Sequence, residues 1–222
     1  MIQYTLYSFW RSSCSARLRI ALNFKGIPFD VVPVNLLNDE HKCSAHKSLN
    51  PSASVPLLVC SDGAKAPIKI GQSLAAIEYL EEAHPQTSLL PLPSDVHGRA
   101  IVRALANIIT CDIQPVTNVR ILKRVGVMGG DQQQWSSELM AEGLGAYEAV
   151  AALHAGQFSY GNSVTLADVC LLPAVWNARR FGVAIDQFPT ILRVAGNLEV
   201  LDAVQRSTYS RQPDTPEQFR SE

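Results

Sequence analysis

Hydrophobic and polar positions in the first part of the chain follow two different periods, and together they predict a strand–helix–strand opening. Residues 2–8 alternate loosely between apolar and polar side chains, which is typical of a strand. Apolar side chains then recur with helical spacing as far as Phe24, and Gly26 stands where a helix C-cap would. Residues 29–34 indicate a second strand, which Pro33 places toward a sheet edge. This βαβ unit implies a parallel strand pair.

A hairpin and a helix are predicted next. Residues 35–54 are polar and irregular or weakly helical, and residues 55–60 form a short apolar strand. A turn with Asp62 and Gly63 precedes the returning strand at residues 67–70. Ser73 is expected to cap the helix that follows, which Pro85 stops. The first 84 residues therefore predict βαβ followed by ββα, with a mixed four-stranded sheet.

Strand patterns disappear after residue 84. Three prolines between residues 85 and 94 indicate a linker. Long helical patterns run from about Val96 to Val125 and from about Gln132 to His154, and Thr165 opens a third helix with a capping box. A fourth helix follows Pro189, and the polar residues from Arg211 onward are expected to lie as a tail. The predicted fold is an α/β domain at 1–84, a linker at 85–94 and an all-helical domain at 95–222.

Composition excludes several classes of function. The chain has 222 residues with 47% hydrophobic and 18% charged side chains, an ordinary globular mixture. Its net charge of −1, without a clustered basic face, argues against nucleic-acid binding, and no apolar run is long enough to span a membrane. The five cysteines are scattered and form no C-x-x-C pair, and the histidines show no metal-ligand spacing. We expect reduced thiols, no metal site and, since the N-terminus lacks a signal-peptide pattern, a cytoplasmic location.

The most informative segment is Ser12-Ser13-Cys14-Ser15-Ala16-Arg17, at the junction of the first strand and the first helix. Ligands gather at the carboxyl ends of strands in open α/β sheets, and a helix N-terminus there favours an anion. A run of hydroxyl groups could donate to that anion. Alternatively, one serine only caps the helix. A third interpretation makes Cys14 a nucleophile, although the sequence identifies no base to activate it.

Two further segments support a binding site. Pro56 opens a strand, and a cis bond before it would expose the backbone of Val55 for pairing with an extended peptide; an ordinary trans proline is the alternative. Ser73, after Gly71 and Gln72, offers a hydroxyl and helix amides to a carboxylate, although alone it is only a good cap. The order of the three segments, followed by an all-helical domain, is what points to function.

The order of these segments, with a helical domain after them, resembles the order found in glutathione transferases. The N-terminal half resembles a thioredoxin-like glutathione-binding domain, and the whole chain resembles the zeta-class glutathione transferases, the maleylacetoacetate isomerases. The most specific match is S-S-C-S-A-R-L-R-I-A-L from Ser12 to Leu22, where Ala16 replaces a tryptophan common in the family. The loop from Asn38 to Lys47 also looks shorter than usual. Further matches are Asn50-Pro51, Val55-Pro56, Gln72-Ser73-Leu74-Ala75, Ile77 to Glu82, Ile113-Gln114-Pro115, Thr165 to Asp168 and Arg211 to Pro216.

The resemblance implies a glutathione-dependent isomerisation of maleylacetoacetate to fumarylacetoacetate, with glutathione as cofactor and a homodimer in the cytoplasm. Ser12, Ser13 and Cys14 would be catalytic, with Ser12 donating to the glutathione sulfur. Arg11 and Arg180 would hold the dianionic keto-acid substrate, unless Arg180 is only a solvated helix-end residue. A general transferase, a maleylpyruvate isomerase and a non-enzymatic relative are the alternatives. The implied glutathione-binding residues are Ser12, Ser13, Cys14, Ser15, Ala16, Arg17, His41, Val55, Gln72, Ser73, Gln114, Asn118, Val119 and Arg120.

Overall fold

The computed structural model describes residues 2–220, and within them the chain forms two compact units. The first unit holds residues 2–88 together with residues 202–220, and the second is Leu89–Leu201. The sequence analysis assigned everything after residue 94 to a helical domain, so the C-terminal segment differs from that expectation. It returns to the first unit and packs there instead of lying as a free tail.

A four-stranded mixed sheet forms the centre of the first unit, in the order β2-β1-β3-β4. Strand β1 (Gln3–Ser8) pairs in parallel with β2 (Asp30–Pro33) and antiparallel with β3 (Leu57–Ser61), which pairs in turn with β4 (Ile68–Gly71). The expected βαβ-ββα order is confirmed, and Pro33 lies on an edge strand, where its missing N–H costs no ladder bond.

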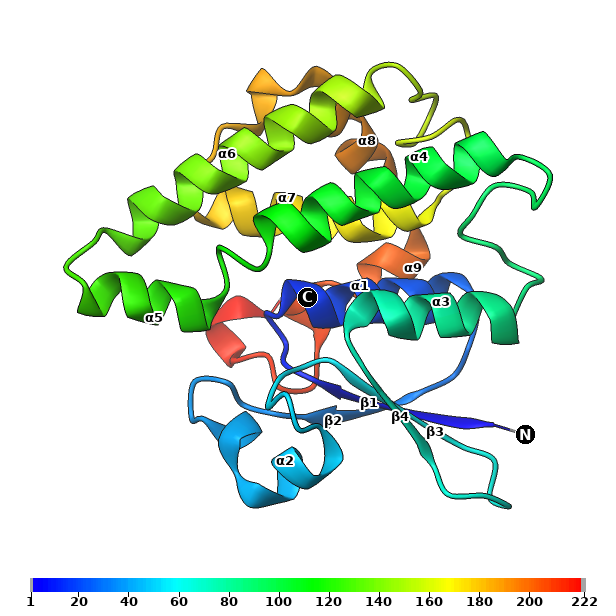
Figure 1. Cartoon of the computed structure of the whole chain (residues 1–222), viewed down its shortest axis with the longest axis vertical. Helices are drawn as coiled ribbons and strands as arrows, with labels where there is room; N and C mark the ends of the chain where they lie inside the picture. The colour runs from blue at the N-terminus through cyan, green and yellow to red at the C-terminus, as the bar shows by residue number, and fades with distance from the viewer. Residues whose placement is uncertain (1, 221–222) are drawn as a thin grey trace. The chain divides into compact units, whose positions relative to one another are not determined.

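Helices α1 (Ser13–Phe24) and α3 (Ser73–Ala83) pack together on one face of this sheet, and the short α2 (Ser44–Leu49) lies on the other side (Figure 1). A 3₁₀ turn, η1 (Glu40–Lys42), precedes α2. The buried ammonium of Lys25 joins the two long helices through an ion pair of 2.5 Å with Glu81. Both helices consequently begin at the same end of the sheet, near the carboxyl end of β1.

The start of α3 differs from the sequence prediction. Ser73 is the first helical residue and not the cap, because Gln72 occupies the cap position. Gln72 has φ of 68° and its side chain makes no capping hydrogen bond. The Ser73 hydroxyl instead accepts a hydrogen bond from another helix, as described below.

The C-terminal segment of the first unit contains α9 (Asp202–Gln205) and two 3₁₀ turns, η4 (Tyr209–Arg211) and η5 (Glu217–Phe219). Helix α9 packs on α1, and the Asn23 amide donates to the Ser207 hydroxyl at 2.8 Å. Gln212 and Thr215 are buried, although the chain from Arg211 onward is mostly polar in sequence.

The second unit is helical, as predicted, but its first helix is interrupted. Helix α4 (Val96–Asn107) continues into a π-helical segment, η2 (Ile108–Ile113), and α5 (Val119–Val127) starts afresh. The expected continuous helix from 96 to 125 is therefore wrong. Close packing accompanies the break, since a Cβ on Gly143 of the facing helix would lie 2.2 Å from Ile113. Pro115 then prevents the original helix from continuing.

The remaining helices of the second unit are α6 (Gln132–Ala151), α7 (Leu166–Arg180), the 3₁₀ turn η3 (Ile185–Gln187) and α8 (Pro189–Glu199). The predicted capping box at Thr165 is present. The fully buried Asp168 carboxylate accepts from the backbone N–H and the hydroxyl of Thr165, at 2.7 and 2.8 Å. Apolar faces of α4, α6, α7 and α8 surround this helix start and form the core of the unit.

Candidate functional site

The candidate site begins at the N-terminus of α1. Ser12 is the N-cap, and its Oγ accepts from the Ser15 N–H at 3.2 Å. Because Oγ is an acceptor in the cap, the hydroxyl proton of Ser12 remains available to a ligand. The amides of Ser13 and Cys14 lie in the first helical turn, where a helix supplies no internal acceptors. Helix capping and ligand donation, which were alternatives in the sequence, are therefore compatible in this geometry.

Arg17 connects this helix start with the start of α3. Its Nη1 donates to Ser73 Oγ at 3.2 Å and lies 3.8 Å from Cys14 Sγ. The side chain is almost fully buried, yet its Nε and Nη2 have no hydrogen-bond partner among the described residues. A buried guanidinium with open donors makes this end of the unit favourable for an anion. Among residues 2–220, Arg17 is also the one hydrogen-bond partner of the Cys14 sulfur, so no base reaches that thiol.

Ser73 is oriented by this contact. Since Arg17 donates to its oxygen, the hydroxyl hydrogen of Ser73 points elsewhere and can be donated to a carboxylate. The preceding Gln72 is exposed and has a positive φ, an uncommon conformation for a residue with a side chain. Such strain tends to persist at sites where a backbone or side chain must face a ligand.

Val55 completes the part of the candidate site that the first unit supplies. The Val55–Pro56 bond is cis, one of the two alternatives that the sequence left open. The Val55 side chain packs with Phe9, Trp10 and Val34 in a small apolar cluster. The backbone before β3 is thereby held against the turn that leads to Ser12. The structure thus brings Val55, the Ser12–Arg17 segment and Ser73 together.

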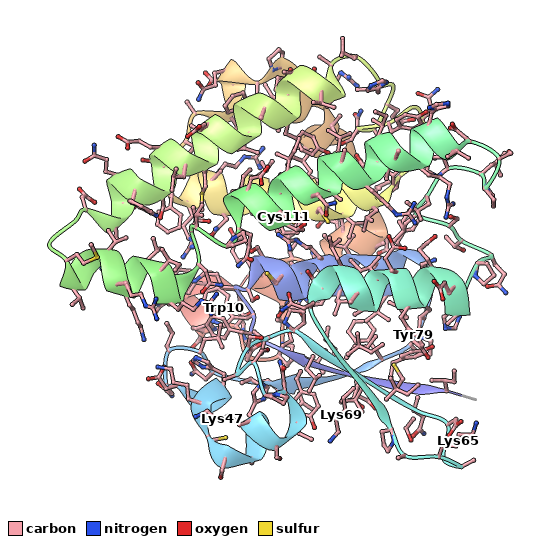
Figure 2. The ribbon with its side chains drawn as sticks, viewed as in Figure 1. Trp10, Lys47, Lys65, Lys69, Tyr79 and Cys111 are labelled. Atoms are coloured by element: carbon pink, nitrogen blue, oxygen red, sulfur yellow. The ribbon has the colours of Figure 1, made fainter. Side chains whose placement is uncertain are left out.

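Arg11 and His41 are the remaining predicted residues of this unit. The Arg11 guanidinium lies over the indole of Trp10, 5.1 Å from the ring centroid. Figure 2 labels Trp10 beside the start of α1. His41 lies in η1, where its Nε2 is 4.0 Å from Asp39 Oδ1. The glutathione contact of His41 and the substrate contact of Arg11 stay predictions.

In the second unit, the predicted residues lie at two places that border the start of α6. Asn118 caps α5, with its Oδ1 accepting from the Arg120 N–H at 3.0 Å, so this segment opens a separate helix and does not continue α4 as expected. Trp135 Nε1 donates to the carbonyl of Val116 at 2.9 Å. Gln114 and Val119 flank that carbonyl in sequence, and their ligand contacts stay predictions.

Arg180 is at the second of these places. It is the last residue of α7, and its Nη2 donates to Asn177 Oδ1. Its guanidinium lies 4.6 Å from the ring centroid of Phe181, whose carbonyl accepts from Gln133 Nε2 at 2.6 Å. The first turn of α6 therefore contacts both the 114–120 segment and the end of α7.

Sequence reasoning missed two residues that hold the backbone of the turn before Ser12. Arg19 and Asp214 both contact the turn before Ser12, and neither had been assigned a role. Arg19 could have been noticed, because a charged residue two positions after Arg17 stands among apolar residues of the same helix. The sequence alone offered no reason to place Asp214 beside Trp10, 204 positions earlier.

Residues 2–220, the described part of the chain, contain neither a membrane-spanning helix nor a cluster of metal ligands. No helix there is long and apolar enough to cross a membrane. No group of three or more histidine, cysteine, aspartate or glutamate side chains in that range could hold a metal ion.

Comparison with known proteins gives consistent matches. Residues 11–83 match the glutathione S-transferase N-terminal domain family. Maleylacetoacetate isomerase maiA of Aspergillus fumigatus is 56% identical over 218 residues, which cover 97% of this chain and 94% of that protein. The crystal structure of maleylacetoacetate isomerase from Anaeromyxobacter dehalogenans with bound GSH has a TM-score of 0.89 and 38% identity, covering 97% of this chain and 99% of that one.

A holo structure of maleyl pyruvate isomerase, a bacterial zeta-class glutathione S-transferase, also has a TM-score of 0.89. It is 43% identical and covers 96% of this chain and 100% of that one. Both the α/β first unit and the helical second unit fall within these matches. The chain therefore belongs to the zeta class of the glutathione transferases, the family that contains the maleylacetoacetate isomerases.

Proposed function

We propose that this protein is a glutathione-dependent cis–trans isomerase that converts maleylacetoacetate to fumarylacetoacetate. The observation that carries the proposal is the pairing of two helix N-termini through Arg17, with Ser12 on one and Ser73 on the other. Open donors at both termini fit a peptide-like cofactor with a thiolate and a carboxylate. Glutathione supplies a thiolate that adds to the conjugated double bond, allows rotation about the resulting single bond and leaves again.

The protein groups have separate roles in this proposal. Ser12 donates its hydroxyl proton to the cofactor sulfur, and the amides and dipole of α1 favour the negative charge there. A hydroxyl donor and a helix dipole together contribute on the order of 2 kcal/mol, enough to lower a thiol pKa by about 1.5 units. Ser13 and Cys14 line the same helix turn, and Cys14 is close to the reaction without acting as its nucleophile.

Three residues hold the rest of the cofactor. The backbone of Val55 pairs with its cysteinyl part, while Gln72 and Ser73 hold the γ-glutamyl carboxylate at the start of α3. Arg17 fixes the Ser73 oxygen as an acceptor, so that the hydroxyl proton is directed at the carboxylate. Further cofactor contacts are proposed for Ser15, Ala16, His41, Gln114, Asn118, Val119 and Arg120.

The substrate carries two negative charges, for which we propose Arg11 and Arg180 as partners. A guanidinium grips a carboxylate through two parallel hydrogen bonds, which gives both affinity and orientation. We further propose that the protein acts as a homodimer in the cytoplasm. None of the five cysteines is joined in a disulfide, which supports a reducing compartment.

Maleylpyruvate is the second candidate substrate, because one of the similar structures is a maleylpyruvate isomerase. The deciding experiment follows the absorbance of maleylacetoacetate and of maleylpyruvate with and without glutathione. We expect turnover of maleylacetoacetate only in the presence of glutathione, with competition by S-methylglutathione. Isomerisation at full rate without any thiol would refute the proposal. A much higher kcat/KM for maleylpyruvate than for maleylacetoacetate would make maleylpyruvate the substrate.

A further inference from the structure

Two charged side chains hold the peptide groups of Trp10 from opposite sides. The Trp10 N–H donates to Asp214 Oδ2 at 2.9 Å, and the Trp10 carbonyl accepts from Arg19 Nη2 at 3.1 Å. Asp214 belongs to the C-terminal segment, whereas Arg19 belongs to α1. Burial lowers the pKa of Arg19 to about 9, and the negative charge of Asp214 offsets part of that shift. The two side chains therefore stabilise each other as well as the turn.

The same arginine organises the rest of the turn. Arg19 Nη1 donates to Ser8 Oγ at 3.0 Å and lies 3.5 Å from the Phe9 carbonyl, and its Nε donates to the Ser207 carbonyl at 3.1 Å. The Phe9 carbonyl also accepts from the Ser12 N–H at 3.0 Å, which closes the turn. Residues 9–12 are thus fixed by hydrogen bonds to Arg19 and Asp214 and by the bond between Ser12 and Phe9 that closes the turn.

The side chain of Trp10 is also held, through contacts of its indole with aromatic rings and a guanidinium. The indole of Trp10 is buried and stacks on Phe219, with ring centroids 5.2 Å apart and planes at 27°. Tyr209 lies on the same indole at 6.3 Å, and Arg11 covers it at 5.1 Å. The C-terminal segment therefore contacts Trp10 through a carboxylate and two rings, directly before Arg11 and Ser12.

We infer that the C-terminal segment, through Asp214, positions the Ser12 hydroxyl for the reaction. This inference rests on the proposed role of Ser12 as donor to the cofactor sulfur. Asp214 touches neither cofactor nor substrate, so it is a positioning residue and not a catalytic one. The geometric demand is strict, because a displacement of about 1 Å in a reacting group can cost on the order of a hundredfold in rate.

The observations distinguish this role from simple packing. A segment needed only to cover apolar surface would contact Trp10 through its rings alone. Asp214 instead places a carboxylate on a backbone N–H, and its other oxygen, Oδ1, is buried without a partner among residues 2–220. The side chain as a whole is half-buried, and its one hydrogen bond in this range goes to the backbone of the turn. That contact fixes the position of the turn directly, which packing of the rings alone would not do.

The test compares Asp214→Ala and Asp214→Asn with Asp202→Ala. Asp202 is a matched control, since it lies in the same segment but has an exposed side chain paired with Arg206. The first measurement is hydrogen exchange of the Trp10 amide without any ligand. We expect at least a tenfold faster exchange in Asp214→Ala and no change in Asp202→Ala. The asparagine variant keeps an acceptor oxygen and should show a smaller effect, which provides a readout if the alanine variant folds poorly.

The second measurement is the effect of Asp214→Ala on kcat/KM, made once in the wild-type protein and once in a Ser12→Ala background. Asp214→Ala should lower kcat/KM about ten- to a hundredfold in the wild-type background and raise the pKa of the bound cofactor thiol, read from thiolate absorbance. In a Ser12→Ala background, the same change should cost less than about threefold, because the group that it positions is gone. Affinity for S-methylglutathione should change little in either background.

Equal losses in both backgrounds would overturn the inference and leave Asp214 as a stability residue. Unchanged Trp10 exchange in Asp214→Ala and Asp214→Asn would also overturn it. If Ser12→Ala alone left the rate and the thiol pKa unchanged, the proposed role of Ser12 would fail and this inference with it. A large effect of Ser12→Ala, with none from Asp214→Ala, would instead refute the inference while the proposed function stood.

Discussion

Ser12 combines two hydrogen-bonding roles that usually belong to different residues. Its oxygen accepts from Ser15 N–H and so begins α1, while its proton remains available for a ligand. Cys14 has the more reactive side chain, but its sulfur contacts Arg17 and no base among residues 2–220. Many nucleophilic side chains have an adjacent base that takes their proton, and Cys14 has none in this range. The geometry therefore favours the hydroxyl as the working group.

Replacing Ser12 and Cys14 in turn distinguishes a mechanism that depends on the serine hydroxyl from one that depends on the cysteine thiol. Ser12→Ala should reduce kcat by on the order of a hundredfold, the range for losing one preorganised donor. Cys14→Ala should keep most of the activity. Steady-state kinetics with saturating glutathione measure both effects. A larger loss in Cys14→Ala than in Ser12→Ala would indicate a cysteine-centred mechanism.

Arg180→Met tests recognition of the substrate charge. A lost charge-assisted hydrogen bond costs about 1.5–3 kcal/mol, so kcat/KM for maleylacetoacetate should fall roughly ten- to a hundredfold. Affinity for glutathione and turnover of a neutral acceptor should hardly change. Arg179→Met is a matched control, because the neighbouring Arg179 pairs with Glu199 instead. Equal losses for charged and neutral acceptors would show that Arg180 supports structure.

At the scale of elements, α7 depends on one buried carboxylate. Asp168 accepts from the backbone N–H groups of Ser159 and Thr165 and from the Thr165 hydroxyl. Burial raises the pKa of Asp168, whereas these donors favour its charged form. The helix start and the preceding loop are thereby fixed to each other in the middle of the second unit.

Asp168→Ala should lower the free energy of unfolding by about 3 kcal/mol, because it removes a helix cap and leaves buried donors unsatisfied. Asp131→Ala provides the comparison, since Asp131 caps α6 at an exposed position and should cost about 1 kcal/mol. Urea denaturation followed by circular dichroism measures both values. Similar losses of unfolding free energy in the two variants would show that the buried capping box of α7 stabilises the protein no more than the exposed cap of α6.

The success of sequence reasoning about these elements depended on how local their causes are. The capping box at Thr165, the turn before Ile68 and the helix start at Ser12 are specified within a few residues, and the structure has all three. The break of the helix between Ile108 and Asn118 was not predictable in this way. It coincides with the close approach of Ile113 to Gly143, a contact between distant positions. The prediction that Ser73 caps α3 was wrong: Gln72 occupies the cap position, and the Ser73 hydroxyl accepts from the distant Arg17.

At the scale of the whole molecule, the unexpected feature is the return of residues 202–220 to the first unit. The residues from Arg211 onward are mostly polar, and polar composition predicts a solvated tail. The contacts that hold the segment include hydrogen bonds with the buried Arg19 and the half-buried Asn23, and a hydrophobicity pattern does not register such contacts. The residues of the candidate site could thus be predicted from local motifs, whereas the support behind Ser12 could not.

Assembly into a homodimer is predicted from the family resemblance, in which the first domain of one subunit pairs with the second domain of its partner. A stable dimer of this kind buries at least about 1,200–2,000 Å² and should persist at micromolar concentration. Sedimentation equilibrium should therefore give twice the chain mass of 24.2 kDa. Because dissociation accompanies unfolding in such dimers, the melting temperature should also rise with protein concentration. A 24.2 kDa species at micromolar concentration, with a melting temperature independent of concentration, would show that the chain works as a monomer.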